Sequence, residues 1–177
     1  MTAQPADVSF ITPDLRALDD QDVTEADNIL VLSAFSDDRP LRGLAGLVDW
    51  RLCGTLSRFI QSSKAIGDYG ERVLLPSGGR LPHAKVLMMG LGPRAQHRAD
   101  RAMSIARDAA KTVVGLGCHT FTSGLFGLED LPTPLDRTAP DLVSELQAIP
   151  EIHHITLVTA GGEMPRSETL VLRQPRR

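Results

Sequence analysis

The hydrophobic pattern opens with a continuous apolar run at residues 29–35, Ile-Leu-Val-Leu-Ser-Ala-Phe. An unbroken run of this length is typical of a strand buried on both faces of a sheet. A second such run covers residues 85–91 and ends in the glycine-rich turn Gly90-Leu91-Gly92. The pattern therefore predicts two central strands, at 29–35 and 85–91.

Two other segments repeat their apolar residues with a helical period. The first predicts one helix over residues 41–62, with a stripe at spacings of four and three made by Leu44, Val48, Leu52, Leu56 and Phe59. The second predicts a helix over residues 98–114 whose inner face carries Ala99, Ala102, Met103, Ala106, Ala110 and Val113. Its small side chains would let this helix lie close to a sheet.

Shorter elements complete the alternation of strands and helices. We predict strands at 72–76, 119–123 and 152–159, a helix at 139–148, and a last apolar run at 170–172. Such alternation indicates an α/β fold, a three-layer α/β/α sandwich around a mixed, mostly parallel sheet. We expect one domain over residues 1–177, with flexible ends at about 1–7 and 173–177.

Composition adds few constraints. The hydrophobic fraction is 42% but the aromatic fraction only 4%, so the core is expected to be aliphatic. A net charge of −3 does not favour nucleic acid or an anionic membrane as a partner. Because we find no secretory signal, no apolar stretch long enough for a bilayer and only Cys53 and Cys118, we expect a reduced, cytoplasmic protein.

Two neighbouring segments carry a resemblance to a known family. Residues 67–76 (Gly-Asp-Tyr-Gly-Glu-Arg-Val-Leu-Leu-Pro) and 84–92 (Ala-Lys-Val-Leu-Met-Met-Gly-Leu-Gly) resemble consecutive strands in the N-terminal domain of leucyl aminopeptidases. The family motifs there read G-E-x-L-L-L-P and A-K-R-V-L-L-V-G-L-G. The likeness covers about residues 27–125, including the flanking helices, and implies a macrodomain-like fold.

The same resemblance argues against peptidase chemistry. Leucyl aminopeptidases bind two metals in a separate C-terminal domain that includes the stretch N-T-D-A-E-G-R, which is absent from these 177 residues. None of the histidines forms an H-E-x-x-H motif, and the adjacent His153 and His154 would point to opposite faces of a strand. We therefore expect no aminopeptidase activity, no metal site and no cofactor.

Nucleophilic cysteine chemistry is equally weakly supported. Cys118 precedes His119 directly, and neighbours on a strand diverge, so they do not readily form a nucleophile–base pair. We predict that Cys53 and Cys118 are both buried, unreactive thiols.

The glycine-rich turns offer one candidate binding site. Residues 122–127 are similar to the S-T-G-[IV]-[FY]-G loop that holds the phosphates of ADP-ribose in macrodomains, and the candidate ligand-binding residues are Ser123, Gly124, Leu125, Phe126 and Gly127, with Gly90 and Gly92 from the earlier turn. Glycine lets backbone N–H groups converge on an anion. The alternative is that these glycines only let the chain turn tightly after a strand. The Asn-rich strand end of active macrodomains is missing here.

A candidate interface lies on the first predicted helix. Trp50 is the only tryptophan, and it lies off the apolar stripe, three residues from Leu47. Residues three apart on a helix are neighbours, so Leu47 and Trp50 would form one apolar patch. Packing of Trp50 against a neighbouring loop is the competing interpretation.

Two functions therefore stay open. The first is a non-catalytic interaction or assembly module with a protein partner or a second copy of the chain. The second is a domain that binds an ADP-ribose-like or other phosphorylated nucleotide. If Leu125 and Phe126 fill the cleft beside their loop, the second function is weakened.

Overall fold

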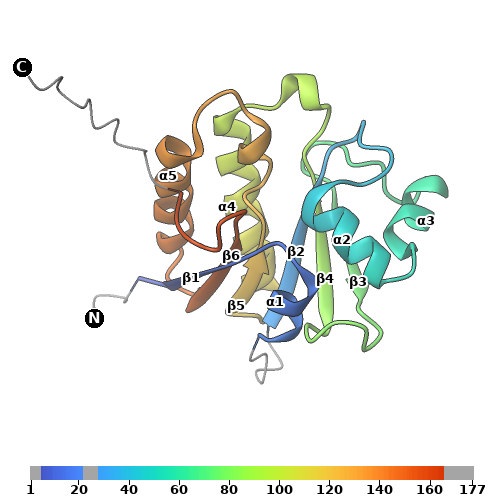
Figure 1. The fold of residues 1–177 in the computed structure, drawn as a ribbon, viewed down its shortest axis with the longest axis horizontal. Helices are drawn as coiled ribbons and strands as arrows, with labels where there is room; N and C mark the ends of the chain where they lie inside the picture. The colour runs from blue at the N-terminus through green and yellow to red at the C-terminus, as the bar shows by residue number, and fades with distance from the viewer. Residues whose placement is uncertain (1–4, 22–27, 166–177) are drawn as a thin grey trace, which may run out of the picture.

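A single mixed sheet forms the centre of the molecule, in a computed structural model that describes residues 5–21 and 28–165 (Figure 1). The strands lie in the order β1-β6-β5-β2-β4-β3. Only β3 runs antiparallel to its neighbour, β4, while every other pair is parallel. The strand bounds are β1 (Asp7–Ile11), β2 (Asn28–Ala34), β3 (Arg72–Pro76), β4 (Lys85–Gly90), β5 (Thr120–Ser123) and β6 (His154–Val158).

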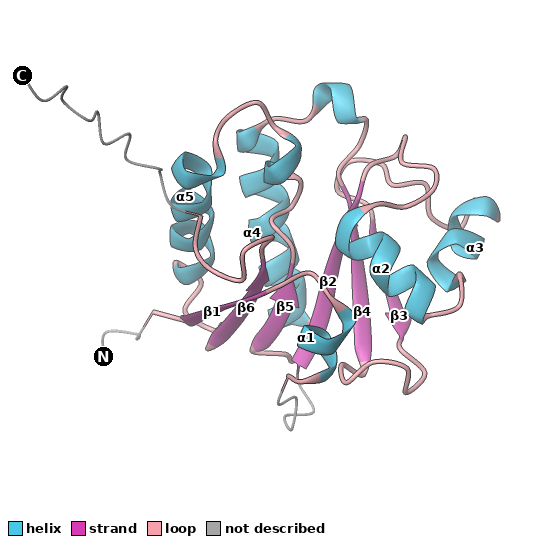
Figure 2. Cartoon of the chain, in the orientation of Figure 1, coloured by secondary structure: helices cyan, strands magenta, loops and turns pink. Residues whose placement is uncertain are grey.

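Helices cover both faces of this sheet and complete the three layers predicted from the sequence (Figure 2). On one face lie α4 (Ala99–Gly115) and α5 (Leu135–Gln147). On the other lie α1 (Leu15–Asp19), α2 (Gly43–Arg51) and α3 (Thr55–Gln61). Short 3-10 turns, η1 (Arg94–Gln96) and η2 (Leu128–Asp130), follow β4 and β5. No helix in the described ranges is both long and apolar enough to cross a bilayer.

The two faces bury separate aliphatic clusters, as alternation along the central strands requires. Ile29 and Val31 of β2 face α4 and α5, whereas Leu30 and Leu32 face α2 and α3. The small residues predicted to let α4 approach the sheet do so, since Ala102, Ala106 and Ala110 are fully buried. That face also buries Ile105 and Ala109, which the predicted stripe omitted.

The prediction of one continuous helix over residues 41–62 is wrong. The helix ends at Arg51, and a second one begins at Thr55. Cys53 and Gly54 both adopt left-handed backbone conformations, with φ of 54° and 76°. The Asp49 carboxylate then accepts hydrogen bonds from the N–H groups of Leu56 and Ser57, which stabilises the new helix start.

The N-terminal region is more ordered than its pattern indicated. Strand β1 and helix α1 were not predicted at all, and Ala6, just before β1, is 3% exposed. Helix α5 begins at Leu135 rather than near residue 139, and it includes Pro140. The apolar run at 170–172 and the basic tail at 173–177 lie outside the described residues.

Candidate functional site

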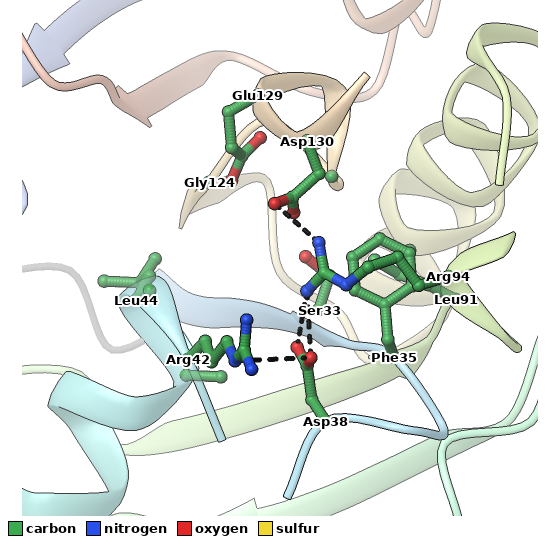
Figure 3. Close-up of a pocket in the computed structure, with 13 residues that line it drawn as sticks. Ser33, Phe35, Asp38, Arg42, Leu44, Leu91, Arg94, Gly124, Glu129 and Asp130 are labelled. Atoms are coloured by element: carbon green, nitrogen blue, oxygen red, sulfur yellow. Dashed lines mark hydrogen bonds and ion pairs between the residues drawn. The ribbon is translucent and has the colours of Figure 1, made fainter. Parts of the chain in front are cut away.

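A small cleft lies where the parallel strands β2 and β5 end, at the edge of the sheet that commonly binds ligands in α/β folds (Figure 3). Its walls come from the β2–α2 segment, the start of η1 and the β5–η2 loop. The cavity measures about 120 Å³. It is lined by Ser33, Phe35, Asp38, Arg42, Gly43, Leu44, Ala45, Leu91, Arg94, Gly124, Gly127, Glu129 and Asp130.

Arg94 spans this cleft and ties its two sides together. Its Nη2 donates to both carboxylate oxygens of Asp38, at 2.9 and 3.0 Å, and its Nη1 lies 2.6 Å from Asp130 Oδ1. The guanidinium also stacks 4.1 Å above the ring of Phe35. The hydrogen bond to Asp38 raises the pKa of Arg94, and Asp130 adds to this effect, so the group stays charged. Figure 3 shows the guanidinium between the two carboxylates.

A buried histidine, His97, contacts the backbone of the loop after β5. His97 Nε2 lies 3.1 Å from the carbonyl oxygen of Phe126, and its ring meets Phe35 edge to face. Burial lowers the pKa of His97, so the imidazole is neutral near pH 7 and its Nε2–H donates to that carbonyl. Phe126 itself adopts a left-handed backbone with φ of 55°. The histidine therefore helps to fix an unusual loop conformation.

Leu125 and Phe126 do not close the cleft. Both side chains are buried, at 3% and 1% exposure, within the cluster between the sheet and the α4–α5 layer. Gly124 and Gly127 line the cavity instead. The N–H groups of Leu125, Phe126 and Gly127 have no acceptor within residues 5–21 and 28–165. This loop thus presents donors of the kind that an anion requires.

The N-terminus of α2 faces the same cavity. Gly43, Leu44 and Ala45 line it, and no side chain of the described residues caps their N–H groups. An uncapped helix start carries partial positive charge and favours an anion. Uncapped donors therefore lie on two sides of one cavity.

Charge and size both oppose a large anion in this conformation. Three carboxylates, of Asp38, Glu129 and Asp130, line the cavity against two guanidinium groups, of Arg42 and Arg94. Pockets for ligands of drug size usually hold roughly 300–1,000 Å³, well above the volume found here. A nucleotide could enter only if Arg94 and its partners moved.

The earlier turn, Gly90 to Gly92, has its donors already bonded. Gly90 N donates to Glu71 O, Leu91 N to Ala34 O and Gly92 N to Gly67 O, at 2.8 to 2.9 Å. A side chain at position 90 would place its Cβ 2.0 Å from the Asp68 carbonyl oxygen. Close backbone packing therefore explains the glycines of this turn.

The candidate interface residues on α2 behave differently from each other. Trp50 is 71% exposed, the largest fraction among the exposed large hydrophobic side chains. Leu47 is half-buried and packs against the cluster under α2 and α3. Trp50 instead borders a groove of about 640 Å³, lined also by Pro40, Leu41, Gly46, Asp49, Arg51, Cys53, Gly54 and Ser57.

The remaining candidate chemistry is mostly absent from the described part of the chain. Cys118 is buried as predicted, but Cys53 is exposed, because the break between α2 and α3 turns it outward. His119 Nδ1 bonds the Glu151 carbonyl oxygen at 2.8 Å, and its ring stacks on His153. Within residues 5–21 and 28–165, no three His, Cys, Asp or Glu side chains gather as a metal site would need.

Sequence reasoning did not identify the Arg94 cluster. Asp38 follows the strand predicted at 29–35, and Arg94 follows the strand predicted at 85–91. The two residues are 56 positions apart, and no local pattern relates them. The available signal was a charged residue three positions after the end of each of two predicted strands, because the ends of parallel neighbours meet at one edge of the sheet.

Comparison with known proteins places this arrangement in context. Residues 31–148 match the family described as "Cytosol aminopeptidase family, N-terminal domain". A protein of Geobacter sulfurreducens named "Probable cytosol aminopeptidase" is 26% identical over 140 residues. That match covers 78% of this chain but only 28% of the relative, so the chain spans just over a quarter of its length.

Solved structures share the fold at low sequence identity. A mutant of tomato leucine aminopeptidase aligns with a TM-score of 0.62 and 15% identity, over 92% of this chain and 34% of that one. The macrodomain of Mycobacterium tuberculosis DarG aligns with 0.65 and 12%, over 87% and 99%. A Trypanosoma brucei macrodomain in complex with ADP-ribose gives 0.61 and 15%, over 88% and 65%. The macrodomain-like fold predicted from the sequence is confirmed.

Proposed function

This chain belongs to the cytosol aminopeptidase family through its N-terminal domain, and on that basis we propose that it is an interaction module without aminopeptidase chemistry of its own. In the Geobacter sulfurreducens relative, the matching region is joined to a much longer chain. A domain of this family thus has surfaces suited to contact with other protein. The proposed partner is a protein, and a second copy of this chain is the first to test.

The observation that carries this proposal is the exposure of Trp50. A tryptophan that is 71% exposed leaves a large apolar area in water, and tryptophan is enriched among the residues that dominate binding energy at interfaces. It stands beside a groove of about 640 Å³ that could receive side chains of a partner. Leu47 is half-buried and packs α2 against the aliphatic cluster beneath it, so we expect it to contribute less to a partner interface than Trp50.

Sedimentation across a concentration series tests this function. Trp50→Ala should weaken association by about 2 kcal/mol, roughly 30-fold in Kd, if Trp50 anchors the interface. Leu74→Ala is the matched control, since Leu74 is 45% exposed but lies on β3. A wild-type chain that stays monomeric, with no Trp50-dependent protein partner in a defined two-protein assay, would remove the basis of the proposal.

The absence of peptidase chemistry has its own test. The pure 177-residue chain should not hydrolyse a leucyl chromogenic substrate in the presence of manganese or zinc. Turnover that survives repurification and disappears with a chelator would contradict this part of the proposal.

A second candidate function is phosphate binding in the cleft. It is favoured by the N–H groups of residues 125–127, which have no acceptor in the described part of the chain, opposite the uncapped start of α2. The proposed ligand is an ADP-ribose-like or other phosphorylated nucleotide. The Arg94 bridge would have to open, so binding should be weak.

Calorimetry with ADP-ribose distinguishes this second function. Gly124→Val should abolish binding, because a branched side chain would narrow the cavity beside Leu44. Gly124 does not have a positive φ, and a Cβ there meets only Leu44 Cδ2, at 3.8 Å. The variant should therefore stay folded. Equal binding by both proteins, or no binding by either, would leave the loop with a structural role only.

A further inference from the structure

The outer strands of the sheet carry polar side chains on the face that α1 covers. Asp7 and Ser9 of β1 stand opposite His154 and Thr156 of β6 in a parallel register. Alternate residues of a strand point to the same face, so all four lie on one side. On β5 the same face carries Thr122, while on β2 it is aliphatic, with Leu30 and Leu32. The change in chemistry marks a region that packing alone does not explain.

These side chains form a connected chain of hydrogen-bonding groups. Ser9 Oγ lies 3.0 Å from His154 Nε2, and His154 Nδ1 lies 3.3 Å from Asp7 Oδ2. Thr156 Oγ1 lies 3.0 Å from Ser9 Oγ and 3.3 Å from the same imidazole nitrogen. A hydroxyl within reach of a base, with the base oriented by a third group, is the arrangement that activates a serine nucleophile.

The Asp7 carboxylate determines which nitrogen of His154 carries the proton. A carboxylate beside Nδ1 favours the imidazole tautomer with its proton on Nδ1. His154 Nε2 is then an acceptor, and Ser9 Oγ–H donates to it. Thr156 Oγ1–H can donate to Ser9 Oγ in turn. The lone pair of Nε2 thus faces the hydroxyl proton that a general base must remove.

A pocket of about 440 Å³ adjoins these hydrogen-bonded side chains. Ser9, His154 and Thr156 line it together with Ile11, Ala17, Asp20, Gln21 and Asn28. Thr122 Oγ1 donates to Gln21 Oε1 at 2.7 Å, which fixes the orientation of that amide. Gln21 Nε2 is buried and has no acceptor in the described part of the chain. The hydrogen-bonded Gln21 side chain is therefore a fixed part of the pocket wall.

We propose that Ser9 and His154, oriented by Asp7, form an acyl-transfer centre that hydrolyses small carboxylic esters. It shares no lining residue with the cleft at Arg94 or the groove at Trp50, so it goes beyond the function proposed above. The charged groups at the pocket are the carboxylates of Asp7 and Asp20, and none of its described lining residues is Lys or Arg. The favoured esters are therefore neutral or cationic.

The reaction needs no component beyond the ester and water. Ser9 Oγ attacks the ester carbonyl carbon while its proton passes to His154 Nε2, and the carbonyl oxygen becomes an oxyanion. The C–O bond to the alcohol breaks, and the alcohol leaves with the proton from Nε2. Water then attacks the acyl-Ser9 carbonyl and gives its proton to Nε2. The Ser9–acyl bond breaks, Oγ regains that proton, and a carboxylic acid is released.

A neutral fluorophosphonate probe and a small p-nitrophenyl ester test this centre on the wild-type chain. We expect the probe to label Ser9, located by mass spectrometry of the digested protein, which requires no variant to fold. Ser9→Ala and His154→Gln should each lower the rate of ester hydrolysis by about 100-fold or more. Ser62→Ala is the matched control, because Ser62 is exposed and its hydroxyl donates to the Phe59 carbonyl oxygen, away from this pocket. It should leave labelling and hydrolysis unchanged.

Asp7 is a positioning residue, and its effect should be smaller. Its side chain is 83% exposed, so solvent weakens its influence on the imidazole. Asp7→Asn should lower the rate only several-fold, because the amide can still lie beside Nδ1 but no longer accepts from it as a charged group. Labelling at other serines alone, or hydrolysis that is indifferent to Ser9→Ala or His154→Gln, overturns the proposal.

Discussion

The two glycine-rich turns end the strands on either side of β2, yet they do different things. In the Gly90 turn, every N–H of residues 90–92 bonds a backbone carbonyl, and the glycines let the 67–69 segment lie against the strand end. In the loop of residues 124–127, three consecutive N–H groups lack an acceptor within the described ranges. Similar sequences thus produce a packed turn in one place and a donor-rich cavity wall in the other.

The difference lies in what approaches each turn from elsewhere in the chain. Asp68 and Tyr69 press against the first turn. The second meets the cavity on one side and His97 on the other. A glycine after a strand therefore indicates that another group lies close to the backbone at that point. Only the three-dimensional fold shows whether that group is another backbone segment or could be a ligand. Substitutions in the two turns can separate these roles.

The largest effect is expected at Gly90. Its Cβ in Gly90→Ala would lie 2.0 Å from the Asp68 carbonyl oxygen, so the backbone must move. We expect a loss of roughly 3 kcal/mol or more in the free energy of unfolding, measured with urea. Gly115→Ala is the control, because a Cβ there meets nothing within 4 Å. A loss at Gly90 below about 1 kcal/mol would contradict the packing explanation.

Gly127 should be the next most sensitive position. It combines a φ of 81° with predicted Cβ distances of 2.8 Å to His97 Nε2 and 2.9 Å to Phe35 Cζ. Gly127→Ala should destabilise by about 2 to 3 kcal/mol, from backbone strain and contact together. Gly79→Ala isolates the strain, since Gly79 has a φ of 73° and open space around it. Equal losses in the two variants would show that contact adds nothing.

Acidification should affect the second loop and not the first. The lowered pKa of His97 means that the unfolded chain, with an ordinary pKa near 6.5, binds the proton first. Stability is therefore complete above about pH 6.5 and falls below it, by at most about 1.4 kcal/mol per pH unit for one histidine.

Thermal unfolding between pH 7.5 and 5.5 measures that slope. His97→Gln should reduce it, because glutamine can still donate to Phe126 but does not titrate. His83 should carry a second part, since burial lowers its pKa to about 4. An unchanged slope in the glutamine variant would remove His97 as the source.

The smallest effect is expected at Gly124. Its φ is not positive, and a Cβ would make only an ordinary contact with Leu44. Gly124→Ala should leave the free energy of unfolding unchanged or raise it by up to about 1 kcal/mol, because alanine restricts the unfolded chain. Urea unfolding beside Gly90→Ala gives the direct comparison. A clear destabilisation would mean that this position is packed like the first turn.

Local pattern was enough to predict the central part of the fold. Strands β2 and β4 are long apolar runs, and α4 has a periodic inner face, so each could be located without its neighbours. The break at Cys53 and Gly54 could not, because the apolar spacing continues through Leu52 and Leu56 without interruption. The break is visible only in the structure, where the Asp49 carboxylate accepts a hydrogen bond from Leu56 N in the first turn of the second helix.

The candidate sites were less predictable, for the same physical reason. Ser123 to Gly127 could be found because the loop is contiguous, although the bridge across it could not. Arg94 and Asp38 meet only because the strands that precede them, β4 and β2, pair directly. Ser9 and His154 meet although they are 145 positions apart. Strand β1 lies at the edge of the sheet, and its alternation of polar and apolar residues is too short to predict a strand, or a site at Ser9, before its pairing with β6 is known.

The pairing of β1 with β6 also has a consequence during protein synthesis. Ser9 and Thr156, which face each other in this pair, are 147 positions apart. At typical rates of about 5–20 residues per second, the ribosome makes β1 roughly 7 to 30 s before β6 exists. Strand β1 must therefore wait for β6, and in that time Asp7 and Ser9 make it a poor template for pairing with other nascent chains.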